Sequence, residues 1–191
     1  MTRPASPFSF PDFRFFWAAR LTATLGQMMM VVIIGWQVYD VARRTMPQKE
    51  AALQLGLVGI VQFLPLVILT LVVGWVADRL DRRWIARTSV LLESGCAAVL
   101  ALTTASGTVT LPVLFVVAAL LGVARAFAQP ALQALSPNLV PKDVLPSAIA
   151  VSSVAWQAGG IIGPALGGFL YAFHPALPYT CLLYTSPSPR D

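Results

Sequence analysis

The chain has 191 residues, of which 57% are hydrophobic and 11% are charged, with two cysteines and a formal net charge of +5. An ordinary soluble domain carries roughly 25% charged residues, so this composition excludes a cytosolic enzyme domain, a disordered tail and a secreted disulfide scaffold. The excess apolar surface must face lipid, which also excludes a nucleic-acid-binding domain and makes membrane orientation the reason for the positive charge.

Several apolar runs are long enough to cross a bilayer, since a membrane helix needs about 20 mostly apolar residues. The predicted spans are 21–39, 53–77, 84–104, 111–135 and 147–173. The first run is full length and ends in Trp36, Tyr39 and Asp40, unlike the short core of a cleaved signal peptide. An aromatic segment at 8–17 precedes it and is expected to lie at the membrane interface. We therefore predict an all-α, polytopic membrane protein with five transmembrane helices.

The distribution of Lys and Arg between the span ends predicts the orientation. With the N-terminus inside, the inner side holds Arg3, Arg14, Arg20, Arg79, Arg82, Arg83, Arg87 and Lys142, and the outer side holds Arg43, Arg44 and Lys49. Eight basic residues against three favour a cytoplasmic N-terminus. We therefore expect a multi-pass protein of the inner (plasma) membrane.

The loop between the second and third predicted spans carries an ordered set of glycine and charged residues. It reads Gly74-Trp-Val-Ala-Asp78-Arg79-Leu-Asp81-Arg82-Arg83. This order resembles the signature loop of the major facilitator superfamily, which lies between the second and third helices on the cytoplasmic side. The resemblance implies that Asp78 engages a helix of the other half and latches one state, although Asp81 stands where the family usually has Gly. The alternative is a basic cluster that only orients the helices.

A second set of small residues lies in the fifth predicted span. It reads Gly159-Gly160-Ile-Ile-Gly163-Pro164-Ala-Leu-Gly167-Gly168. Glycines at four-residue spacing allow close helix packing, which is the structural interpretation of Gly159, Gly163 and Gly167. The Gly-Pro pair followed by Gly-Gly also resembles the fifth-helix motif of the family's drug- and proton-coupled exporters, with Ala150 where that motif has a further Gly.

The fourth predicted span contains Arg125, at a place where the family's exporters often carry an Arg. The resemblance extends from Phe8 to Thr180 and is strongest to the branch that contains the enterobactin exporter and related efflux permeases. It implies about twelve helices in two six-helix halves around a central cavity, with this chain as the first half lacking its sixth helix.

The last residues, 181–191, resemble the translation of a transposase adapter that is attached to DNA fragments before sequencing. We expect this segment to be non-native and residues 1–180 to be a partial N-terminal half that lacks its C-terminal partner half. The alternative is a genuine short periplasmic tail.

Arg125 and Glu93 lie inside predicted spans, where an ionisable residue costs roughly 3 kcal/mol or more and needs a reason. At 1.5 Å per residue their expected depths in the membrane differ by only about 4 Å, so the side chains could pair. One interpretation is a structural ion pair. The other is functional: the resemblance implies that Arg125 lines the cavity, and Glu93 either pairs with it or takes a proton, because burial and the guanidinium act on the carboxyl in opposite senses.

Three glutamines, Gln27, Gln62 and Gln157, lie within the first, second and fifth predicted spans. The resemblance places those helices around the cavity. Each glutamine could contact substrate or could join helices through hydrogen bonds.

These features favour a secondary active transporter that exports an amphipathic small molecule by proton antiport. The expected partners are the bilayer, the substrate and protons, with no nucleic acid, cofactor or metal. A membrane-embedded enzyme is disfavoured, since the sequence has no metal-spaced His/Cys/Asp cluster, no Gly-x-Ser-x-Gly and no His within a span. A non-transporting membrane scaffold or sensor is the alternative, and the fragment by itself is expected to be inactive.

Overall fold

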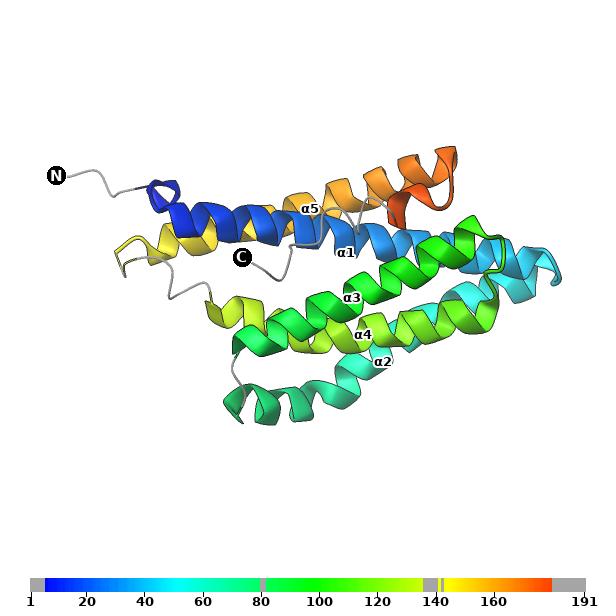
Figure 1. Ribbon diagram of the computed structural model, residues 1–191, viewed down its shortest axis with the longest axis horizontal. Helices are drawn as coiled ribbons and strands as arrows, with labels where there is room; N and C mark the ends of the chain where they lie inside the picture. The colour runs from blue at the N-terminus through cyan, green and yellow to red at the C-terminus, as the bar shows by residue number, and fades with distance from the viewer. Residues whose placement is uncertain (1–5, 80–81, 136–140, 142, 180–191) are drawn as a thin grey trace.

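In the part of the chain that the structure describes, the computed structural model has five long helices and a short 3-10 turn (Figure 1). The helices are α1 (Pro11–Arg43), α2 (Gln48–Arg79), α3 (Arg82–Ala105), α4 (Leu111–Leu135) and α5 (Leu145–Phe173), and the turn is η1 (Pro7–Ser9). The structure describes residues 6–79, 82–135, 141 and 143–179, without the side chains of 70–71, 74–78, 82–83, 86 and 129–135. Within these residues there is no strand, which confirms the all-α fold class.

The helices form a bundle in which α1 pairs with α5, while α4 lies between α2 and α3 (Figure 1). Helix α2 also packs on α1 and so joins the two groups. We call the end where α1 ends and α2 begins the Asp40 end, and the end where α2 ends and α3 begins the Arg79 end. The buried core includes Ile33 and Ile34 of α1, Leu100 of α3 and Leu114 of α4, which are fully buried.

Within the described residues, each of the five helices is long and apolar enough to cross a membrane, which confirms the predicted number of spans. Helix α2 shows why the bundle needs lipid: Leu53, Ile60 and Ile68 are each about 60% exposed, and such a surface is not stable in water. Helix α1 differs from the prediction because it begins at Pro11 rather than at residue 21. Proline is favoured in the first turn and Asp12 complements the N-terminal dipole, so the helix extends back through the aromatic segment.

The pairing of α1 with α5 depends on the glycines predicted to allow close packing. A Cβ atom on Gly163 would lie 2.8 Å from the Leu25 carbonyl oxygen, and one on Gly159 would lie 2.6 Å from the Thr24 methyl carbon. A Cβ atom on Gly167 would likewise lie 2.6 Å from Met29 Cγ. The backbones can therefore approach only because these positions lack side chains, and the structure supports the packing interpretation of the motif.

A hydrogen-bonded chain closes the bundle at the Asp40 end. The Tyr179 hydroxyl donates to Gln37 Oε1 at 2.5 Å, and Gln37 Nε2 donates to Thr104 Oγ1 at 2.6 Å. The segment after α5 is thereby tied to α1 and α3. Burial raises the pKa of Tyr179 above its ordinary value, so the hydroxyl keeps the proton that it donates. Nearby, the Tyr171 hydroxyl donates to Asp40 Oδ2 at 2.8 Å and joins α5 to α1.

Candidate functional site

Arg125 lies in α4 and joins three helices through its guanidinium. Its Nη2 donates to the Gln27 carbonyl oxygen of α1 at 3.0 Å, and its Nη1 donates to Gln62 Oε1 of α2 at 3.4 Å. Within the described residues, the third nitrogen, Nε, is buried and has no hydrogen-bond partner. A guanidinium has five N–H donors, so several of them make no hydrogen bond to the described part of the chain.

A close contact between α2 and α4 sets the position of Arg125. Gly122 lies one helical turn before Arg125, and a Cβ atom on Gly122 would collide with the Gln62 carbonyl oxygen and lie 3.2 Å from Pro65 Cγ. Because residues three apart lie on the same side of a helix, this contact directs Arg125 toward the Gln62 side chain. Pro65 lies within α2.

A groove between α1 and α2 runs from Arg125 toward the Asp40 end. Its deeper part has a volume of about 330 Å³. The part nearer the Asp40 end has a volume of about 460 Å³. The two parts share Val31, Gly35 and Leu55, so they form one continuous groove, which we call the α1–α2 groove. Arg125 and Gln62 lie at its deep end, and Trp36 and Tyr39 lie at its mouth.

A smaller polar pocket lies on the other side of Arg125, toward the Arg79 end. It has a volume of about 50 Å³ and we call it the Glu93 pocket. Its lining residues are Arg20, Ala23, Thr24, Gln27, Val90, Glu93, Ala128 and Trp156. Along α1 the pocket ends at Gln27 and the groove begins at Val31, about one helical turn further on. Arg125, bound to the Gln27 carbonyl, therefore separates a groove and a pocket that face opposite ends of the bundle.

Glu93 and Arg125 were considered as an ion pair, and the structure places them near each other without direct contact. Both residues lie in the described part of the chain, and no hydrogen bond or ion pair joins them. Their charges still attract across the short distance between α3 and α4. Arg125 instead donates its hydrogen bonds to Gln27 of α1 and Gln62 of α2.

The remaining predicted residues are distributed unevenly around this site. The Gln27 side chain lines the Glu93 pocket while its backbone binds Arg125. Gln157 is exposed on α5 and lines neither the groove nor the pocket. Gly160 and Gly168 have open space around them, with no atom within 4 Å of an added Cβ.

The signature loop joins α2 to α3 at the Arg79 end. Gly74 and Asp78 lie in the last turns of α2, which ends at the exposed Arg79, and Arg82 and Arg83 begin α3. The side chains of Asp78, Arg82 and Arg83, and all of Asp81, Lys142 and the predicted adapter segment, lie outside the described residues.

The sequence did not single out Arg20 or Gly59 as site residues. Arg20 precedes the charge-free run of α1 and was counted only as an orienting charge, yet it lines the Glu93 pocket. Gly59 lines the α1–α2 groove and has no atom within 4 Å of an added Cβ, so it leaves room there. Neither role has a sequence signal, because each depends on how the helices are rotated.

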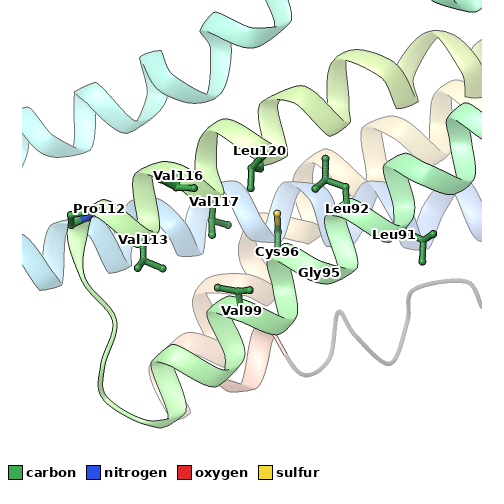
Figure 2. A pocket seen from close by; sticks show the side chains of 10 residues that line it. All are labelled: Leu91, Leu92, Gly95, Cys96, Val99, Pro112, Val113, Val116, Val117 and Leu120. Atoms are coloured by element: carbon green, nitrogen blue, oxygen red, sulfur yellow. The ribbon is translucent and has the colours of Figure 1, made fainter.

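A second groove lies between α3 and α4, and Figure 2 shows it from close by. It has a volume of about 560 Å³ and we call it the α3–α4 groove. Its lining residues are Leu91, Leu92, Gly95, Cys96, Val99, Pro112, Val113, Val116, Val117 and Leu120. None of them is charged, so nothing in the groove can orient a polar ligand.

Comparison with known proteins gives consistent results. A family model described as transmembrane secretion effector matches residues 2–184. The chain is 25% identical over 164 residues to the staphyloferrin A transporter of Staphylococcus aureus, covering 85% of this chain and 40% of that protein. It is 31% identical over 163 residues to the multidrug efflux pump Tap of Mycolicibacterium fortuitum, covering 81% of this chain and 37% of that protein. The chain thus spans well under half the length of these relatives.

Proposed function

This chain belongs to the transmembrane secretion effector family of the major facilitator superfamily, and from that premise we propose that it forms part of a secondary active exporter. The exported cargo is an amphipathic small molecule, such as a siderophore or a drug-like compound, and the driving force is proton antiport. Transport proceeds by alternating access about a site near the middle of the membrane. The relatives' names, a staphyloferrin A transporter and a multidrug efflux pump, support small-molecule export.

The observation that carries this proposal is the position of Arg125. A charged residue within a membrane span is costly and marks a functional site by default. Arg125 lies between the α1–α2 groove and the Glu93 pocket, which face opposite ends of the bundle. This is the position that a residue contacting cargo from either side of the membrane must hold.

Glu93 is the proton-coupling residue in this proposal. It lines a small pocket with Arg20 and Gln27, and its charge is felt by Arg125. A change in the protonation state of Glu93 changes its attraction for the guanidinium. Proton binding at Glu93 and cargo binding at Arg125 are therefore energetically coupled.

The N-terminus and the Arg79 end face the cytoplasm in this proposal, following the excess of Lys and Arg predicted for that side. The signature loop then lies on the cytoplasmic face. Asp78 latches one state by meeting a helix N-terminus of the other half, where a carboxylate is favoured.

The experiment compares efflux by the full-length gene product and by Glu93→Gln in everted vesicles under an imposed pH gradient. We expect Glu93→Gln to abolish gradient-driven efflux. Glu50→Gln is the matched control, because Glu50 is exposed in the first turn of α2, and it should transport normally. Unchanged efflux by Glu93→Gln would show that Glu93 does not take part in the mechanism. If the unaltered protein does not change the amount of cargo in the vesicles, the transporter proposal itself is contradicted.

A further inference from the structure

We propose that the cargo carries an anionic head group, that Arg125 binds this head group at the deep end of the α1–α2 groove, and that Gln62 occupies the head-group position when the groove is empty. The inference rests on the proposed export function and adds the chemical class of the cargo. It also assigns Gln62 a role distinct from substrate contact.

Charge complementarity supports an anion at this position. Arg125 contributes to the wall of the groove, and its hydrogen bonds within the described residues go to a backbone carbonyl and an uncharged amide. Among the described side chains no carboxylate is hydrogen-bonded to it, and its buried Nε has no partner there. Glu93 lines the pocket on the other side of Arg125 and is absent from the groove wall. A buried cation without a hydrogen-bonded anion is costly, so an anionic ligand in the groove would gain a charge-assisted contact.

The two hydrogen bonds of Arg125 differ in a way that identifies the exchangeable one. The bond to the Gln27 carbonyl is 3.0 Å long and involves backbone that cannot move away. The bond to Gln62 is 3.4 Å long, beyond the usual 2.7–3.2 Å range. A glutamine side chain can rotate to release its partner, whereas a carboxylate oxygen in its place would form a shorter and stronger bond to the guanidinium. Gln62 Oε1 therefore marks the position of a head-group oxygen.

The rest of the α1–α2 groove suits an apolar body attached to that head. Val58, Phe63 and Leu66 line it beside Gln62, and Trp36 and Tyr39 line its mouth. Gly59 provides open space in the groove wall. A cargo molecule thus lies with its anion on Arg125 and its apolar part directed toward the Asp40 end.

The test measures binding of two probes with the same apolar tail, 11-(dansylamino)undecanoic acid and its methyl ester. The full-length gene product is purified into phosphatidylcholine nanodiscs, and dansyl fluorescence is titrated at pH 7.5 without any gradient. We expect the acid to bind about tenfold tighter than the ester, as one charge-assisted contact predicts. Gln62→Glu supplies its own carboxylate to Arg125, so it should remove the preference for the acid.

Control variants separate this effect from misfolding. Gln157→Glu adds the same charge at an exposed position of α5 and should keep the preference for the acid. Gln62→Leu removes the exchangeable group without adding charge, and it should also keep the preference. If Gln62→Leu and unaltered protein bind acid and ester equally, the inference is overturned.

Two further outcomes bear on the source of the anion and on the proposed function. Displacement of the acid probe by phosphatidylglycerol added to the nanodiscs would overturn the cargo assignment and make the groove an anionic lipid site. Because binding is measured without transport, a protein that prefers the acid but exports nothing would contradict the proposed function alone. Efflux without preference for the acid would contradict only the head-group inference.

Discussion

The α1–α2 groove and the α3–α4 groove are comparable in size but differ in chemistry. The α3–α4 groove has a volume of about 560 Å³ and is lined by apolar side chains and one thiol (Figure 2). The deeper part of the α1–α2 groove is smaller, at about 330 Å³, but it ends at Arg125 and Gln62. In a membrane bundle, an apolar hollow on the surface contacts lipid tails as any apolar surface does, so volume alone does not indicate a binding site. A few polar groups at the end of an apolar groove are what give orientation and specificity.

Among changes to residues that line the two grooves, the largest effect should come from removing the charge that distinguishes them. Arg125→Leu should lower efflux by about 100-fold, because losing a charge-assisted contact costs about 2–5 kcal/mol and each 1.4 kcal/mol is tenfold. Thermal stability should not fall, since leucine is favoured in a membrane helix. Leu120→Ala, on the same helix but lining the α3–α4 groove, should leave efflux within about twofold. Efflux is measured per amount of folded protein. A similar loss for Arg125→Leu and Leu120→Ala would contradict the proposed functional difference between the two grooves.

A smaller effect should come from the glycines that line each groove. Gly122→Ala forces a Cβ against the Gln62 backbone and should destabilise the bundle by about 1–3 kcal/mol through overpacking. Gly95 lines the α3–α4 groove, and no atom lies within 4 Å of a Cβ added there. Gly95→Ala should therefore stabilise α3 by up to about 1 kcal/mol, because alanine has a higher helix propensity than glycine. Unfolding of both variants in a detergent titration measures the difference, and equal stability would mean that α2 and α4 do not meet as described.

Narrowing the α1–α2 groove tests whether its open space is used. Gly59→Val projects a side chain into the groove without a clash and should lower efflux about tenfold, the result of losing roughly 1.4 kcal/mol of cargo binding. Gly56→Val adds the same side chain one turn away on α2, also in open space and outside the groove wall, and should transport normally. The measurement is the efflux rate of each variant, normalised to the amount of protein. Equal rates for Gly59→Val and Gly56→Val would contradict the assignment of the groove.

The smallest effect should come from Tyr179, which belongs to neither groove. Tyr179→Phe should destabilise the bundle by about 1 kcal/mol, since it removes one buried hydrogen bond to Gln37. Because burial raises the pKa of Tyr179, its contribution to stability should be complete below about pH 10 and lost as the pH rises further. Unfolding measured against pH should show a smaller alkaline loss in Tyr179→Phe, and an equal loss would mean that Tyr179 is not buried as described.

The sequence predicted the features that follow from composition and spacing along one helix. Five spans, the glycine face of α5 and a charged residue at mid-span were all evident from hydropathy and period. What it could not predict was how the helices are rotated against one another. The main acceptor for Arg125 is the backbone carbonyl of Gln27, which no residue type signals, and Gln157 is exposed although its position in the span matched that of the other glutamines.

The hydropathy pattern also could not predict the residue at which α1 begins. The hydropathy pattern placed the start of the span just after Arg20, the charged residue that precedes the apolar run. The helix itself begins earlier, at Pro11. Arg14 and Arg20 are tolerated in it because long basic side chains can reach the membrane interface from a helix end.

The central claim is that cargo and water reach the α1–α2 groove while the α3–α4 groove faces lipid. It is tested most directly by placing a single cysteine in each groove, Gly59→Cys or Val116→Cys, in the full-length gene product with Cys96 replaced by alanine and no other cysteine present. The rate of modification by a membrane-impermeant, water-soluble thiosulfonate is then measured in lipid vesicles. We predict that the cysteine at position 59 reacts about tenfold faster or more, because a water-exposed thiol ionises and its thiolate attacks the thiosulfonate, which forms a mixed disulfide and releases sulfinate. We also predict that this modification blocks efflux. Equal rates at the two positions, or a block of efflux from position 116 alone, would contradict the account.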